Sequence, residues 1–134
     1  MILIRKLLIL CAVCLLSSCG RSWYEVRDME QLLDAHLMGK VKFVDRQEQW
    51  IDFIGDGEKV VLFNVLDATA LSPSTHTMLP YDSATVEQRF SQSPLYPHLK
   101  HTAGYYIDKQ EDDQQQSLFY DTVGSRLVYY LSIM

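Results

Sequence analysis

The chain reads VVLFNVL from residue 60 to residue 66, and this apolar stretch decides the fold. Side chains alternate between the two faces of an extended strand, so a strand that is apolar at nearly every position is typically covered on both faces. A second extended run at residues 49–54 is joined to it through Gly55-Asp56-Gly57-Glu58, which is typical of a hairpin. We therefore expect residues 60–66 to form a central strand of a sheet.

Further strands are predicted on both sides of this hairpin. Residues 40–43 alternate between Lys and an apolar side chain, which predicts a half-buried strand. Three apolar runs nearer the C-terminus predict strands at residues 103–108, 118–122 and 127–133. Residues 111–116 contain only Glu, Asp and Gln and predict a hairpin loop, and Gly124 is expected to adopt positive φ in the last turn.

An amphipathic helix is predicted near the N-terminus. Its apolar positions recur at spacings of three and four residues: Val26, Met29, Leu33 and Leu37. Asp28 with Gln31 resembles a capping box, and Gly39 provides a stop. Because the polar face of this helix is acidic rather than basic, we expect the apolar face to pack on the core and not on a bilayer.

The middle of the chain predicts a long surface loop and a second helix. Residues 67–80 are rich in Ser, Thr and Pro and have no apolar period. The second helix begins at Asp82 or Ser83, packs Val86 and Phe90 inward, and ends near Ser93-Pro94. Pro94 and Pro97 are then expected to keep the chain extended up to the next strand. Two helices and about six strands predict an α+β fold: a single small domain with an antiparallel sheet and the helices on one face.

The N-terminus has the three parts of a secretory signal. Arg5 and Lys6 precede an apolar stretch that is too short to span a membrane, and the stretch closes on Leu16-Ser17-Ser18-Cys19-Gly20. This segment resembles the type II signal peptide of bacterial lipoproteins, a resemblance limited to the first twenty residues. It implies removal of residues 1–18, lipidation of the Cys19 thiol, a tether at residues 19–24 and a domain at residues 25–134. An ordinary secretory signal is the alternative.

The same resemblance implies an address in the bacterial cell envelope. The lipid on Cys19 would hold the chain on a membrane, with the domain in the periplasm. Gly20 stands where aspartate marks retention in the inner membrane of enteric bacteria, so the outer membrane is mildly preferred. Cys11 and Cys14 lie within the segment to be removed, and therefore no free thiol would remain.

Removal of residues 1–18 changes the net charge from −5 to −7, because it removes Arg5 and Lys6. An acidic domain disfavours nucleic acid and can steer a basic protein toward itself. We therefore expect a protein partner with a basic surface, and no nucleic-acid binding.

Each candidate metal site or catalytic motif in the sequence lacks residues that it would need. His98 and His101 have the spacing of two metal ligands, but zinc requires a third, which only folding could supply from His76 or Asp108. The acidic loop fails as a calcium loop, because Asp113 stands where glycine is needed and Phe119 where glutamate is needed. Nucleophile-elbow and phosphate-loop motifs are absent, so we assign no catalytic, cofactor or metal residues.

The remaining signal is an excess of tyrosine in the C-terminal strands. The doublets Tyr105-Tyr106 and Tyr129-Tyr130 should each place one ring in the core and one outward, which predicts a row of partly exposed rings. These observations favour a lipid-anchored envelope protein that acts as a non-catalytic binding module, as an inhibitor or immunity-type factor or as an accessory to envelope assembly. The alternative is a small periplasmic metal-dependent hydrolase that uses His98 and His101.

Overall fold

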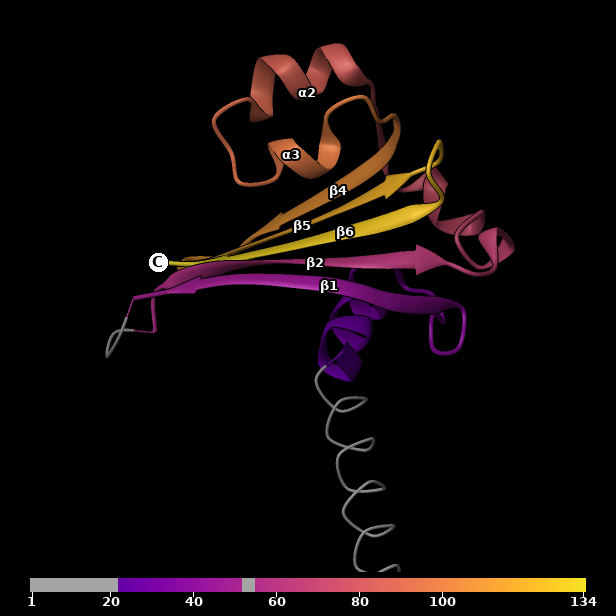
Figure 1. Cartoon of the computed structure of the whole chain (residues 1–134). Helices are drawn as coiled ribbons and strands as arrows, with labels where there is room; N and C mark the ends of the chain where they lie inside the picture. Colours follow the sequence, from indigo (N-terminus) through magenta and orange to yellow (C-terminus); the bar gives the residue numbers. More distant parts are fainter. Residues whose placement is uncertain (1–21, 52–54) are drawn as a thin grey trace, which may run out of the picture.

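The computed structural model describes residues 22–51 and 55–134. These residues form one antiparallel sheet with the strand order β1-β2-β6-β5-β4-β3. The strands have the following bounds: β1 Val41–Trp50, β2 Gly57–Val65, β3 Leu79–Tyr81, β4 Gly104–Gln110, β5 Gln114–Asp121 and β6 Arg126–Ile133. The described part of the chain therefore confirms a single small domain built on an antiparallel sheet with helices (Figure 1).

The VVLFNVL stretch forms most of β2, which is an interior strand as predicted. It pairs with β1 on one side and with β6 on the other. Val61 and Phe63 face one core cluster, whereas Val60 and Leu62 face the other. Both faces of β2 are thus buried, which is the physical reason for its apolar side chains at consecutive positions.

Helices cover both faces of the sheet, so the prediction of helices on one face is wrong. The N-terminal helix (residues 22–33 of the described chain) lies on one face, and the short helices α2 (Ser83–Phe90) and α3 (Tyr96–Leu99) lie on the other (Figure 1). Each helical layer closes its own core cluster. The stretch after α2 is partly helical rather than extended as predicted. Pro97 is compatible with this helix because it lies in the first turn of α3, where a backbone N–H has no partner within the helix.

The N-terminal helix differs from its prediction at both ends. Residues 22–24, which we expected in the tether, are helical, so Asp28 lies inside the helix instead of capping it. The helix ends at Leu33, because Asp34 has the positive φ of 51°, and it does not continue to Gly39. The Glu30 side chain anchors the segment after the helix, because its carboxylate accepts a hydrogen bond of 2.8 Å from the Leu37 backbone N–H. Leu37 is thereby held in the core although it lies outside the helix.

Residues 67–80 are more ordered than a surface loop. They contain two 3-10 turns, η1 (Ala68–Ala70) and η2 (Pro73–His76), and lead into β3. Leu71 and Met78 are buried, which anchors this connection in the core. The second helix begins as predicted, because Asp82 caps α2 and its side chain accepts a hydrogen bond from the Thr85 backbone N–H. It ends at Phe90, however, and not near Ser93-Pro94.

β1 is one long strand at the edge of the sheet. The strand predicted at 40–43 and the run predicted at 49–54 belong to it as far as Trp50, whereas residues 52–54 lie outside the described residues. A register shift between Phe43 and Asp45 leaves Val44 as an extra residue. β1 is mostly exposed rather than half-buried, because an edge strand has a neighbour on one side only and is less covered than an interior strand.

A buried ion cluster joins the N-terminal helix to the sheet. The Glu25 side chain is 2% exposed, and its Oε1 lies 2.7 Å from an Arg46 guanidinium nitrogen and 3.0 Å from Lys59 Nζ. Glu25 Oε2 is buried without a hydrogen-bond partner. Two cations therefore converge on one carboxylate between the helix and strands β1 and β2.

Candidate binding site at the acidic end of the sheet

A pocket lies at one end of the sheet, where the β1–β2 hairpin meets the end of β6. Its cavity volume is about 660 Å³. β1 contributes Glu48, Gln49 and Trp50, β2 contributes Gly57 and Glu58, and β6 contributes Ser132 and Ile133. Because β2 pairs with both neighbours, register alone brings these residues together.

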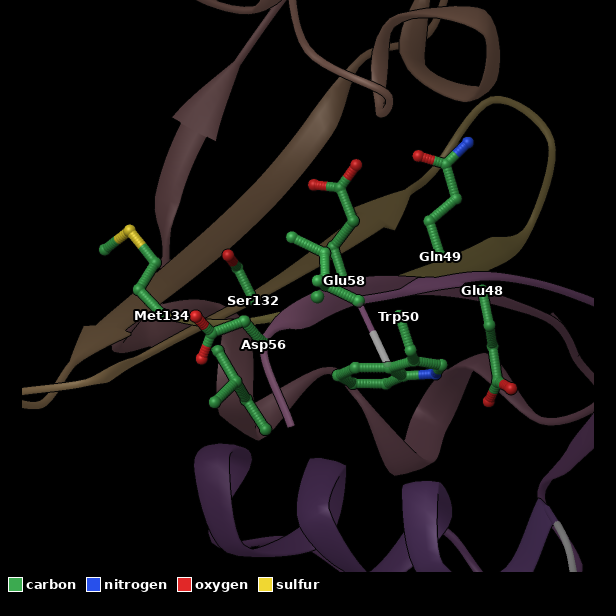
Figure 2. A pocket seen from close by; sticks show the side chains of 10 residues that line it. Glu48, Gln49, Trp50, Asp56, Glu58, Ser132 and Met134 are labelled. Atoms are coloured by element: carbon green, nitrogen blue, oxygen red, sulfur yellow. The ribbon is translucent and has the colours of Figure 1, made fainter. Parts of the chain in front are cut away.

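The pocket extends around both faces of the sheet end. Gln49 pairs with Glu58 in the register, and both side chains lie on one side of the sheet, whereas Trp50 and Glu48 lie on the other (Figure 2). Trp50 pairs with Gly57, where a Cβ would come within 2.5 Å of the indole ring. Glycine at position 57 therefore makes room for the Trp50 ring.

The apolar part of the lining is unusually exposed. Trp50 is 40% exposed, Ile51 is 63% exposed and Met134 is 75% exposed. Exposed apolar side chains are ordinary when they are scattered, but here three of them line one concave site together with Ile133. A contact of this kind favours an apolar group on a partner.

The charged part of the lining is acidic only. Glu48, Asp56 and Glu58 line the pocket, and no Lys, Arg or His is among the lining residues. Glu58 accepts a hydrogen bond of 2.9 Å from the Tyr130 hydroxyl. Burial first, and then this hydrogen bond, raise the pKa of Tyr130, so its hydroxyl remains a hydrogen-bond donor to Glu58 at neutral pH. Glu48 lies 3.4 Å from an Arg46 guanidinium nitrogen.

The acidic loop singled out in the sequence lies at this same end of the sheet. Mutual backbone hydrogen bonds between Glu111 and Gln114 close a turn with Asp112 and Asp113 at its tip. The loop is shorter than predicted, since Gln114 already belongs to β5. The Met134 N–H donates a hydrogen bond of 2.9 Å to the Asp113 carbonyl oxygen, which places the turn beside the pocket.

We call this region the acidic end of the sheet. It comprises six carboxylate residues, three in the pocket and three in the adjacent turn: Glu48, Asp56, Glu58, Glu111, Asp112 and Asp113. Lys109, 3.3 Å from Glu111, is the nearest counter-charge in the turn. The turn is recognisable in the sequence but the pocket is not, because nothing in the sequence pairs residues 48–58 with residues 132–134.

β1 extends the acidic end along one edge of the sheet. It is the first strand in the order, so its outer backbone N–H and C=O groups have no neighbouring strand among the described residues. An unpaired edge of ten residues can accept an extended segment of another chain by strand addition. β3, at the opposite edge, has three residues and includes Pro80, which makes it a poor edge for pairing.

The tyrosine doublets are split across the sheet as predicted, but they do not form an exposed row. Tyr106 and Tyr129 are buried. Tyr105 and Tyr130 are partly buried against the two core clusters. Because helices cover both faces, neither ring of a doublet is left on an open surface, so this part of the predicted binding face is wrong.

The histidine pair is placed as follows. His98 is in α3, and its Nε2 lies 3.2 Å from Gln47 Oε1. His101 follows the helix with φ 64° and is exposed. In the described ranges, no group of three His, Cys, Asp or Glu side chains is arranged to hold a metal ion. Burial lowers the pKa of His98.

A second cavity, of about 570 Å³, lies at the other end of the sheet, between the end of the N-terminal helix and the 3-10 turns. Its charged lining is mixed, since Lys40 Nζ lies 3.3 Å from Asp67 Oδ2. Asp67 also accepts a hydrogen bond from the Thr69 backbone N–H, and its contacts with Thr69 and Lys40 lower its pKa. None of the large exposed apolar side chains of the described residues lines this cavity.

The lipobox and Cys19 lie outside the described residues. In the part of the chain that the structure describes, none of the helices has the length and apolar character needed to cross a membrane. No protein-family model matches the sequence, and neither a curated protein nor a solved structure matches the chain.

Proposed function

We propose that this chain is a lipid-anchored protein of the bacterial cell envelope that binds a basic protein at the acidic end of its sheet. The lipobox ending at Cys19 supports the anchor. The pocket supports binding, because exposed apolar side chains line it together with three carboxylates. The single observation that carries the proposal is this combination of apolar lining and uniform charge in one concave site.

The chemistry of the pocket specifies the chemistry of the partner. Trp50, Ile51 and Met134 offer contact area to an apolar side chain, and aromatic anchors of this kind dominate binding energy at interfaces. The surrounding carboxylates favour Lys or Arg next to that side chain. The β1 edge adds backbone hydrogen-bonding groups, so an extended basic segment with an apolar residue fits the site best.

The proposed action is binding without catalysis. Glu48 forms an ion pair with Arg46, and Glu58 accepts a hydrogen bond from the Tyr130 hydroxyl, so both side chains already have partners within the protein. The pocket contains one hydroxyl, Ser132, which pairs with Glu58 in the register, but no His, Cys or Lys is among the lining residues. An inhibitor, an immunity-type factor or an assembly accessory each needs only the recognition surface.

Site-specific photocrosslinking of the full-length protein in bacteria tests the binding site. A benzophenone amino acid at position 51 should crosslink to a basic protein, because Ile51 is 63% exposed and lines the pocket. The matched control places the same group at Val123, which is 73% exposed in the turn at the opposite end of the sheet. The adduct should disappear when Glu48, Asp56 and Glu58 are replaced by their amides. Equal adducts from both positions, or adducts that survive neutralisation, would refute the assignment.

Radioactive palmitate tests the anchor. Wild-type protein should be labelled, and Cys19→Ala should abolish the label and accumulate uncleaved precursor, because the type II signal peptidase acts after lipidation. Normal processing and membrane fractionation of Cys19→Ala would contradict the proposed anchor.

A further inference from the structure

We propose that Trp23 and Tyr24 insert into the lipid headgroup layer and fix the orientation of the domain on the membrane. This inference rests on the proposed lipidation of Cys19. Both rings stand in the first turn of the described N-terminal helix, with Trp23 41% exposed and Tyr24 66% exposed. Neither belongs to a core cluster.

The two rings and a neighbouring cation form one small surface. The ring centroids of Trp23 and Tyr24 are 5.4 Å apart in an edge-to-face arrangement. The Arg27 guanidinium carbon lies 5.4 Å from the Trp23 ring centroid. An aromatic pair beside an arginine combines apolar area, hydroxyl and indole N–H donors, and a positive charge.

Chain length places this surface next to the bilayer. Trp23 follows Cys19 by four residues. A fully extended chain spans at most about 3.6 Å per residue, so the two Cα atoms are separated by no more than about 14 Å. The polar layer of each leaflet is about 5 to 8 Å thick. A lipid on Cys19 thus keeps the Trp23 backbone within about 14 Å of the lipidated residue, and all but the most extended conformations of the connecting residues bring the ring to the headgroups.

The side-chain chemistry matches that layer. Tryptophan and tyrosine concentrate at membrane interfaces, where the ring is shielded and its polar tip remains hydrated. Arg27 can pair with lipid phosphates. The nearby Glu25 does not oppose this contact, because its carboxylate is buried against Arg46 and Lys59. The rest of the domain is acidic and is repelled by anionic headgroups, which leaves the aromatic surface as the favoured contact.

Tryptophan fluorescence of the full-length lipidated protein tests the inference. The chain has two tryptophans, so Trp50→Phe leaves Trp23 as the only indole. The protein is reconstituted into vesicles of phosphatidylethanolamine and phosphatidylglycerol. Trp23 emission should shift to shorter wavelength on reconstitution and lose most of its intensity when the lipids carry bromine near the headgroup. Trp23→Phe is the matched control, in which Trp50 should remain unquenched by bromine and accessible to acrylamide.

Flotation of the vesicles separates the two levels of the proposal. Protein that fails to float with the vesicles overturns the lipid anchor, and the inference falls with it. Protein that floats while Trp23 shows no blue shift and no bromine quenching leaves the anchor intact and overturns the insertion of the rings. The same negative result would be obtained if Trp23 and Tyr24 contacted another protein instead of lipid.

Discussion

The Glu25 carboxylate should contribute strongly to stability, and Glu25→Gln is the variant that measures it. The substitution keeps the size of the side chain and removes its charge, which leaves the cations of Arg46 and Lys59 without their common partner. Their side chains are 20% and 14% exposed, respectively. Loss of one partner from a fully buried ion pair costs about 3 to 5 kcal/mol. Because both cations retain some contact with water, we expect a loss of about 2 kcal/mol in the free energy of unfolding.

Urea and thermal unfolding, followed by circular dichroism, provide the assay. For a domain of this size, about 2 kcal/mol corresponds to a fall in Tm of roughly 8 °C. The matched control is Glu111→Gln, which removes an ion pair of 3.3 Å whose side chains are 59% and 57% exposed. Exposed pairs contribute about 0 to 1 kcal/mol, so this control should change Tm little.

A second substitution shows whether Glu25→Gln lowers stability through the charges left behind or through loss of packing. Lys59→Met in the Glu25→Gln background should restore part of the lost stability, because it removes one of the two cations that have lost the Glu25 carboxylate. If Glu25→Gln unfolded as the wild type does, the cations would be solvated well enough without the carboxylate. The reasoning about the buried cluster would then be wrong.

Three further predictions concern the core, a helix cap and the acidic turn. Phe119→Ala should lower the free energy of unfolding by about 3 to 5 kcal/mol in urea titrations, because Phe119 is fully buried in the cluster under α2 and α3. The backbone hydrogen bond from Thr85 lowers the pKa of Asp82, so its contribution to stability is present above the unfolded pKa of about 3.9 and is lost as the pH falls through the folded pKa. Wild type and Asp82→Ala should therefore differ more in Tm at pH 6 than at pH 2. Replacing Asp112 and Asp113 with Asn should slow association with the crosslinked partner, measured by surface plasmon resonance, more than it speeds dissociation, and added salt should reduce the difference.

Local patterns predicted the elements that depend on local physics. The VVLFNVL stretch predicted an interior strand because burial on both faces requires apolar side chains at consecutive positions. Asp82 and the spacing of Val86 and Phe90 predicted α2 because a cap and one apolar side are sufficient for a short helix. A strand with apolar side chains on both faces, such as residues 60–66, needs a packing layer on each face of the sheet. The expectation that both helices lie on one face was inconsistent with this requirement.

The acidic end could not be predicted in full, because it depends on pairings between distant segments. Asp112 and Asp113 were recognisable as a solvated turn, but their position beside Met134 requires the β4–β5 and β5–β6 registers. Ser125, and not Gly124, adopts positive φ in the last turn. The Asp121 side chain accepts hydrogen bonds from the backbone N–H groups of the two residues after Thr122, which fixes that turn in a way composition does not reveal.

The mass of the mature protein is the most direct test of the central claim that the chain is lipid-anchored through Cys19. The full-length gene product is expressed in a bacterial host, extracted from membranes in detergent and analysed by intact-mass and N-terminal peptide spectrometry. The account predicts a chain that begins at Cys19, with a diacylglyceryl group on the thiol and acylation of the new amino group. A chain that retains residues 1–18, or that begins elsewhere with an unmodified Cys19, would contradict it.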